Sequence, residues 1–385
     1  MVNLPLPPMQ PDGPLLTKPI IVAPDTSHWA AWIDDALDSL SSKNGSALTL
    51  HERLLAQGKV PLLSWHHLDE LLCVASEDSA TARVRFIQSL PMVAFMRMPG
   101  EEAGLAAITD LLSAEAIAAT EGATSTAQVR DRARAMLLRI GSGVEAIGSD
   151  GWVWQVARRA MLEQKPHSGM VAALEGLPGV DSTVTFGSLK SHRRTSPEEQ
   201  MRAFASLRQK AYAEAMRADP RRGAAEASLL ADAFLSRVIE MTPSSETSPQ
   251  EMFAEIYISQ GLDAAEIRDD ATIEELSTLA TFRTQLRVVA DRTRLPFETL
   301  KRIPDRLLPS RRIAEALRQH GQDRTARPAS DVHDRALAAL AAYVDVLYVD
   351  KRTSEDFLRV GRREPELAGI FGTVKKASIY LALAD

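Results

Sequence analysis

Apolar residues gather in short continuous runs near both ends of the chain. Residues 19–25 read Pro-Ile-Ile-Val-Ala-Pro-Asp, and further runs follow at residues 60–65 and 92–97. Runs of this length suit strands that are buried on both faces of a parallel sheet. Between the runs the apolar spacing is helical, with Trp29 and Trp32 on one predicted face. The alternation of strand and helix predicts a wound α/β sheet.

The pattern changes after the third run. From residue 101 to 327 the chain is rich in alanine and leucine, and its apolar positions follow a helical period. Capping boxes, in which serine precedes proline and glutamate follows at the third helical position, predict helix starts at Ser196 and Ser248. The only β-like stretch in this region is at residues 182–186. We therefore predict a large, mainly α-helical insertion.

The strand pattern returns near the C-terminal end. Residues 344–350 read as a strand that ends in a carboxylate, and residues 370–383 hold one further strand or helix. We predict that the sheet is assembled from both ends of the chain, around the inserted helices. The predicted units are a proline-rich arm at 1–17, the N-terminal half of the α/β domain at 18–100, the helical insertion at 101–327 and the C-terminal half of the α/β domain at 328–385.

Composition limits the classes of function. The chain has 385 residues, of which 45% are apolar and 25% charged, so we expect a sizeable core. Its net charge of −6 argues against a general nucleic-acid coat protein. Cys73 is the only cysteine, which excludes a disulfide framework and a cysteine-rich zinc module. No apolar run has the length of a membrane helix, and residues 1–14 lack the order of a signal peptide. We expect a cytoplasmic protein without membrane contact.

Carboxylates stand where the predicted elements meet. Asp25 and Asp350 end strands, Glu70 lies in the helix after the second strand, and Asp334 lies near a helix start. Ligand sites in open α/β sheets lie outside the carboxyl ends of the strands. Acidic groups gathered there suit Mg²⁺ or Mn²⁺, which prefer hard oxygen ligands. The ordinary alternative is that each aspartate only caps a helix. We assign Asp345, which would turn to the opposite side from Asp350, to structure.

Three motifs carry a resemblance to a known family. The first is Pro24-Asp25-Thr26-Ser27 at the end of the first strand, and the second is Ser64 followed six residues later by Glu70. The third is Ser330-Asp331-Val332-His333-Asp334, followed by Ala341-Ala342-Tyr343-Val344-Asp345 and Val349-Asp350-Lys351. In this order they resemble the PIN-domain nucleases, which are metal-dependent and mainly cleave RNA. The resemblance covers roughly residues 18–100 and 329–385.

The resemblance implies a PIN-like α/β fold and hydrolysis of phosphodiester bonds by a metal-activated water. The implied catalytic residues and metal ligands are Asp25, Glu70, Asp334 and Asp350, with Asp331 as a further or alternative ligand. Ser27 and Ser64 would support the ligands. Ala342, Leu337 and Tyr348 depart from the pattern of the subgroup that the third motif resembles. These departures leave the third ligand and a second metal ion open.

Basic residues are concentrated just before the third motif. Residues 283–327 contain twelve basic and five acidic residues, and eleven of the basic ones are arginine. Arginine binds phosphate with a two-pronged geometry, so this segment is a candidate path for a nucleic-acid backbone. The alternative is a helical face paired with the acidic residues of 245–280. The predicted nucleic-acid contacts are Arg302, Arg306, Arg311, Arg312, Lys351 and Arg352.

The expected substrate is RNA rather than DNA, an expectation that comes from the family alone. The helical insertion would restrict access, sense a trigger, mediate a homodimer or bind a protein or regulatory partner. A role as a regulated bacterial stress or defence nuclease is an extrapolation from the resemblance. Two alternatives stay open: a non-catalytic interaction or scaffold protein with a degenerate PIN-like domain, and a phosphatase that uses the same carboxylates.

Overall fold

The structure is a computed structural model that describes residues 18–74, 76–174, 182–191, 196–218, 222–241, 248–322 and 337–385. The predicted proline-rich arm at 1–17 lies outside these residues, and so do Asp331 and Asp334. Within the described ranges, no helix combines the length and the apolar character that crossing a membrane requires.

Six strands form one sheet in the order β4-β3-β2-β1-β5-β6. Strand β1 pairs in parallel with β2 on one side and with β5 on the other, and Val22 lies opposite both Pro61 and Val346. The sheet is therefore built from both ends of the chain, as the sequence predicts. The strands are β1 (Ile20–Ala23), β2 (Lys59–Leu63), β3 (Val93–Met96), β4 (Leu138–Gly141), β5 (Val346–Val349) and β6 (Thr373–Lys376).

Strand β4 corrects two expectations. It runs antiparallel to β3, so the sheet is mixed rather than wholly parallel. It also lies inside the region 101–327, where the sequence indicates a β-like stretch only at residues 182–186. That stretch contributes an isolated bridge between Thr185 and Thr272. The sheet thus extends into the region that was predicted as a helical insertion.

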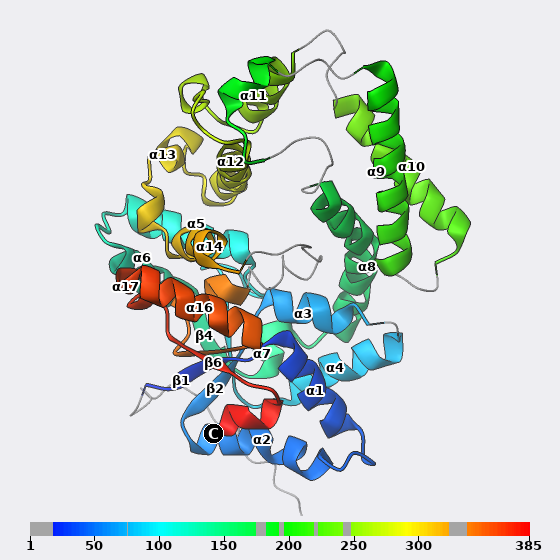
Figure 1. Cartoon of the computed structure of the whole chain (residues 1–385). Coiled ribbons are helices and arrows are strands. Elements are labelled where there is room, and N and C mark those ends of the chain that lie inside the picture. Colours follow the sequence, from blue (N-terminus) through cyan, green and yellow to red (C-terminus); the bar gives the residue numbers. More distant parts are fainter. Residues whose placement is uncertain are drawn as a thin grey trace, which may run out of the picture.

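Alternate residues of each strand enter two separate cores. Val22 of β1 packs in the core on one face, whereas Ile21 and Ala23 pack in the core on the other. In β5, Tyr348 and Leu347 divide between the same two cores. Successive side chains of a strand point to opposite faces, so both faces of these strands must be apolar. Helices cover both faces and make a three-layer α/β/α arrangement (Figure 1).

A tryptophan pair on α1 anchors the first helical layer. Trp29 and Trp32 are fully buried and stacked, with ring centroids 5.0 Å apart. Each indole N–H donates to a backbone carbonyl, of Leu62 and Ala47 respectively. The large rings are therefore buried without an unpaired donor. This layer consists of α1 (Thr26–Leu37), α2 (Asn44–Ala56), α3 (Trp65–Leu72), α4 (Glu77–Ser89), α7 (Gly143–Ile147), the first part of α8 (Gly151–Leu174) and the 3₁₀ turn η5 (Tyr380–Ala384).

The second layer combines helices from the middle and the end of the chain. Leu111, Ala133 and Ile313 pack in the same core as Ala23. Three helices of this layer lie within residues 101–327. Part of the region that the sequence predicts as an insertion therefore packs against the sheet. The layer consists of α5 (Ile108–Thr120), α6 (Thr126–Leu137), α14 (Pro309–His320), α16 (Lys351–Arg363) and α17 (Pro365–Ala368).

Other helices form smaller cores, one shared by α9 and α10 and another by η1, α11 and α12. These helices lie away from the sheet in Figure 1. Both predicted capping boxes are confirmed, with Ser196 bonded to Glu199 and Ser248 to Glu251. The remaining elements are η1 (Phe186–Ser191), α9 (Pro197–Ala218), α10 (Ala224–Met241), α11 (Pro249–Ser259), η2 (Ala264–Glu266), α12 (Ile273–Thr293), α13 (Phe297–Lys301), η3 (Asp305–Leu307) and η4 (Leu340–Ala342).

One carboxyl group is enclosed in the second-layer core. Glu115 of α5 is fully buried and accepts hydrogen bonds from the backbone N–H of Ser310, at 2.9 Å, and from its hydroxyl, at 2.8 Å. The hydroxyl of Tyr343 donates a third bond. Burial raises the pKa of Glu115 to about 7, although these hydrogen bonds oppose the shift. Glu115 therefore joins α5 to the start of α14 and to the segment before β5.

Candidate functional site

The carboxyl ends of three adjacent strands carry the residues that the sequence singled out. Strands β2, β1 and β5 are neighbours and run in the same direction. Each is followed by a helix, and the N-cap residues of those helices are Ser64, Asp25 and Asp350. Because Val22 lies opposite both Pro61 and Val346, these three N-caps stand at the same end of the sheet, where the parallel strands terminate. We call this end the carboxyl edge, and the end where these strands begin the amino edge. The fold thus places Asp25 and Asp350, which are far apart in the sequence, at the carboxyl ends of adjacent strands.

Asp25 and Asp350 hold their helices in the same way. Oδ1 of Asp25 accepts the backbone N–H of Ser27 at 2.7 Å, and Oδ1 of Asp350 accepts that of Thr353 at 2.7 Å. These are ordinary helix caps, as the alternative interpretation of the sequence expects. Each cap uses one carboxylate oxygen and leaves Oδ2 without a hydrogen bond to a described residue. Asp25 is half-buried and Asp350 is exposed, so a cation has access to both.

A buried hydroxyl lies directly beside Asp25. Oγ1 of Thr26 is inaccessible to solvent and has no hydrogen-bond partner among the described residues. Glu70 of α3 is half-buried and likewise makes no hydrogen bond or ion pair within the described part of the chain. Carboxylate oxygens with a spare hydroxyl are the donors that Mg²⁺ and Mn²⁺ prefer. The types of donor present, carboxylate and hydroxyl oxygen, therefore suit such a cation.

The predicted ligand set is only partly assembled by the described residues. Asp331 and Asp334 lie outside them. Among the residues that the structure describes, no three His, Cys, Asp or Glu side chains form a group suited to holding a metal ion. Asp25 and Asp350 follow neighbouring strands, and the whole ligand set stays a prediction.

His67 is a residue of this edge that the sequence reasoning missed. It is fully buried, and its Nδ1 accepts the backbone N–H of Ser64 at 3.0 Å. Its Nε2 therefore carries the proton and donates to the carbonyl of Pro24 at 2.8 Å. Burial lowers the pKa of His67 to about 4, although the bond to Pro24 and the charge of Asp25 oppose the shift. A neutral imidazole thus ties the end of β1 to the end of β2.

The sequence held a signal for this role. Ser64 and His67 stand in the positions of a capping box, in which the third helical residue returns a hydrogen bond to the N-cap. Glutamate or glutamine usually occupies the third position. A histidine at this position can accept a hydrogen bond from the N-cap backbone with one ring nitrogen. Its other ring nitrogen is then able to donate to the backbone of a neighbouring strand.

Asp345 lies at the opposite edge, where β5 begins, as the sequence predicts. Its Oδ2 accepts the backbone N–H of Ile21 at 2.8 Å. The same oxygen is 2.9 Å from the guanidinium of Arg134. Asp345 therefore holds the start of β5 against β1. It lies at the opposite end of the strands from Asp25 and Asp350.

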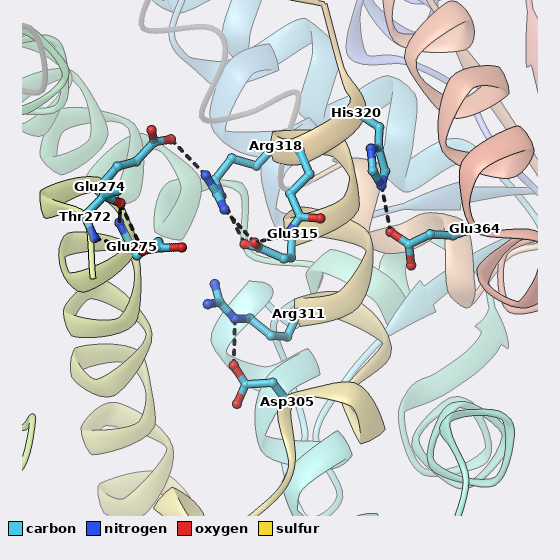
Figure 2. A network of polar contacts seen from close by, with 10 residues as sticks. Thr272, Glu274, Glu275, Asp305, Arg311, Glu315, Arg318, His320 and Glu364 are labelled. Carbon is cyan, nitrogen blue, oxygen red and sulfur yellow. Dashed lines mark hydrogen bonds and ion pairs between the residues drawn. The ribbon is translucent and has the colours of Figure 1, made fainter. Parts of the chain in front are cut away.

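Many residues of the basic segment are bonded within the protein. Arg318 on α14 bonds Glu315 at 2.6 Å and Glu274 of α12 at 2.9 Å, and Figure 2 shows this bridge between the two helices. The hydrogen bond from Arg318 lowers the pKa of Glu315. Two further acids of residues 245–280 have partners in the segment: Glu266 bonds Arg283 and Asp263 bonds Lys301. These contacts favour the alternative in which the segment pairs with the acidic stretch before it.

The six predicted nucleic-acid contacts divide into two groups. Arg311 bonds Asp305 at 3.3 Å, as Figure 2 shows, and Arg312 bonds Glu364 at 3.4 Å. Lys351 is exposed and lies 3.7 Å from Glu355. Three are exposed and make no side-chain ion pair with a described residue: Arg302, Arg306 and Arg352. Of the six, Lys351 and Arg352 are next to a candidate ligand, Asp350.

Comparison with protein-family models, curated proteins and solved structures finds no match to this chain. The likeness to the PIN-domain nucleases therefore rests on the motif residues alone.

Proposed function

We propose that the chain is a divalent-metal-dependent nuclease with a PIN-like α/β domain, and that it hydrolyses RNA in preference to DNA. The observation that supports the proposal is the shared position of Asp25 and Asp350. Both are N-caps at the carboxyl ends of adjacent parallel strands. In open α/β sheets this edge is where ligands bind. The preference for RNA comes from the resemblance to the PIN-domain nucleases.

In this proposal Asp25, Glu70 and Asp350 hold Mg²⁺ or Mn²⁺, joined by Asp331 or Asp334. When bound, the cation makes a coordinated water more acidic and offsets charge on the attacked phosphate. The starts of α1, α3 and α16 face the same edge, and the partial positive charge of helix N-termini favours a phosphate there. His67 keeps the Pro24 carbonyl and the N-cap of α3 in place beside this phosphate.

Lys351 and Arg352 are the proposed contacts to the nucleic-acid backbone nearest the cleaved bond. Both are exposed and directly follow Asp350. Arg302 and Arg306 are exposed as well and would extend the contact along the backbone. Arg311 and Arg312 would have to exchange an internal carboxylate for a phosphate, so they are weaker candidates.

The decisive experiment replaces Asp25 and Asp350 with asparagine, one at a time. Asparagine caps helices as well as aspartate does, so both variants keep the fold and lose only the charge. Asp38→Asn is a matched control because Asp38 accepts the N–H of Leu40 at the other end of α1, as Asp25 accepts that of Ser27. We expect Mn²⁺-dependent cleavage of a labelled single-stranded RNA to fall at least 100-fold in both variants, equivalent to about 3 kcal/mol of activation free energy.

The control variant should cleave like the wild type, and a chelator should abolish cleavage by both. A DNA of the same sequence tests the preference for RNA, and a small phosphate ester tests the phosphatase alternative. Cleavage that persists in Asp25→Asn and Asp350→Asn contradicts the proposed role of this edge.

The second candidate function is a non-catalytic interaction protein, and exposed apolar side chains on α8 favour it. Trp152 and Val156 lie one turn apart and are 65% and 62% exposed. Large apolar groups in such positions are typical of surfaces that bind another protein. For such a protein, the wild-type chain would not cleave RNA with any divalent cation, and the asparagine variants would behave like it.

A further inference from the structure

A second concave site lies at the other edge of the sheet, away from Asp25 and Asp350. Lys18 before β1, Asp345 before β5 and Thr373 at the start of β6 line it, so it faces the amino ends of these parallel strands. Helices α6 and α16 supply most of the remaining lining. The cavity volume is about 790 Å³. Small-molecule sites in proteins typically have volumes of roughly 300–1,000 Å³.

Small residues form part of the lining. Ala342, Gly361, Ala368 and Gly372 all line the cavity. A Cβ atom at Gly372 would lie 2.3 Å from the carbonyl oxygen of Val344, so the backbone can pass there only as glycine. Gly372 therefore allows the chain before β6 to pack closely against the chain before β5.

The lining is positively charged on an acidic protein. Four cationic side chains line the cavity (Lys18, Arg130, Arg134 and Arg362), and the lining contains two acids, Asp131 and Asp345. The chain as a whole carries a net charge of −6. This edge therefore attracts anions although the protein as a whole does not.

Two of the arginines are held in place by the protein. Arg134 bonds both oxygens of Asp345. Arg130 bonds Asp131 at 2.8 Å and also donates to two backbone carbonyls, those of Gly369 and Ile370. These groups are rigid, and the two acids offset their charge.

Lys18 and Arg362 are different. Both are exposed, and neither makes a hydrogen bond or an ion pair with a described residue. They leave two positive charges uncompensated beside the cavity. The apolar part of the lining includes two aromatic rings, since Phe357 and Phe371 meet edge to face with centroids 5.2 Å apart.

We propose that this cavity binds a small phosphate monoester that carries a flat apolar ring system, the chemistry of a nucleoside monophosphate. A phosphate monoester carries a charge of about −1.5 to −2 at neutral pH, which matches Lys18 and Arg362. The ring system packs against Phe371, which is half-buried, and Phe357 supports the ring of Phe371 from the core. The volume is far larger than inorganic phosphate needs. The site lies at the opposite edge from the candidate metal centre and does not depend on the proposed nuclease activity.

Isothermal titration of the full chain with AMP tests the proposal, with adenosine and inorganic phosphate as separate probes. We expect AMP to bind, and both other probes to bind at least about tenfold more weakly because each lacks one of the two recognised groups. Lys18→Gln and Arg362→Gln should each weaken AMP binding by about tenfold. Arg359→Gln is the matched control, since Arg359 is exposed on the same helix but does not line the cavity.

Three results would overturn the proposal: no binding of AMP, equal effects of Arg359→Gln and Arg362→Gln, or adenosine bound as tightly as AMP. Asp25→Asn separates this site from the candidate metal centre. It should leave the AMP affinity unchanged, and loss of AMP binding in that variant would assign the ligand to the other edge.

Discussion

The hydroxyl of Tyr343 donates a hydrogen bond to Oε1 of Glu115, although 228 residues separate the two in the sequence. Tyr343 and Asp345 belong to the third motif of the sequence, and both have structural partners. Tyr343 bonds Glu115, and Asp345 bonds the backbone of Ile21 and the side chain of Arg134. This part of the motif therefore fixes the entry into β5, and so the position from which Asp350 follows.

Stability should depend on pH through Glu115. Because its pKa is raised from 4.5 to about 7, the folded protein holds this proton more tightly than the unfolded chain does. The stability that this group contributes is fully present below pH 4.5 and is lost as the pH rises through 7, by about 3 kcal/mol. Glu115→Gln removes the titration. We predict that the free energy of unfolding of the wild type falls relative to that of the variant between pH 5 and pH 8, as measured by urea denaturation.

Tyr343→Phe is the companion to this measurement. The hydrogen bond from Tyr343 lowers the pKa of Glu115, so its loss should raise that pKa further and move the transition to higher pH. A difference between wild type and Glu115→Gln that stays constant with pH would show that Glu115 keeps the same protonation state throughout.

The contribution of His67 to stability should depend on pH in the opposite way to that of Glu115. Its pKa is lowered from 6.5 to about 4, so the folded protein releases this proton more readily than the unfolded chain does. The corresponding stability is present above pH 6.5 and is lost as the pH falls through 4, by about 3 kcal/mol. His67→Phe should destabilise the protein at pH 7 by about 1–3 kcal/mol for each of the two buried backbone groups that it leaves unpaired.

The destabilisation caused by His67→Phe should shrink as the pH falls from 6.5 to 4. In this range Glu115 acts the other way, so the variants at the two positions should have pH profiles of opposite slope. Leu68→Ala, a buried change in the same helix without a titrating group, is the control and should give a destabilisation independent of pH.

The helix caps allow stability and activity to be separated. Asp25→Ala and Asp350→Ala remove the acceptor for the first turn of α1 and of α16, so each should cost about 1 kcal/mol. The asparagine variants should lose at most a few tenths of a kcal/mol of stability. Thermal or urea unfolding of all four measures this. Equal destabilisation by alanine and asparagine would show that the charge, rather than the capping bond, stabilises these helices.

Salt dependence tests the proposed contact with the nucleic-acid backbone. Removing the charges of Lys351 and Arg352 together should lower the magnitude of the slope of log affinity for single-stranded RNA against log salt by about 1.4. Arg311→Gln should leave the slope unchanged because Asp305 already binds Arg311. A titration at several salt concentrations measures both, and a slope that responds to Arg311 alone would move the contact to α14.

Four of the six strands in the described sheet were predictable because each of the four is a short apolar run between helical patterns. The sequence indicated β1, β2, β3 and β5 close to their observed bounds. It gave no sign of β4, whose four residues Leu138–Gly141 are half-buried and follow an arginine-rich helix. An edge strand that pairs on one side needs little apolar periodicity, so pattern alone does not reveal it.

The boundaries of the insertion stay a prediction, because helical pattern alone does not separate helices that cover the sheet from helices that pack on one another. The apolar faces of α5 and α6 look like those of α9 and α10, although the first pair covers the sheet and the second pair packs together. Helical periodicity shows that a face is buried but not what buries it. At the candidate site, the caps Asp25 and Asp350 followed from position after a strand. The role of His67 could not be predicted in the same way. Its ring bonds backbone groups at the ends of two strands, and only the fold shows that these strands are neighbours.

The pairing of β1 with β5 also constrains how the protein is made. Ile21 and Asp345, which bond to each other, are 324 residues apart. Ribosomes add about 5–20 residues per second, so roughly 20 to 60 s pass between the synthesis of β1 and that of its partner strand β5. Over that time the nascent polypeptide exposes an unpaired strand, which invites mispairing and chaperone binding. Strand β5 can pair with β1 only after the residues between Ile21 and Asp345 have been translated.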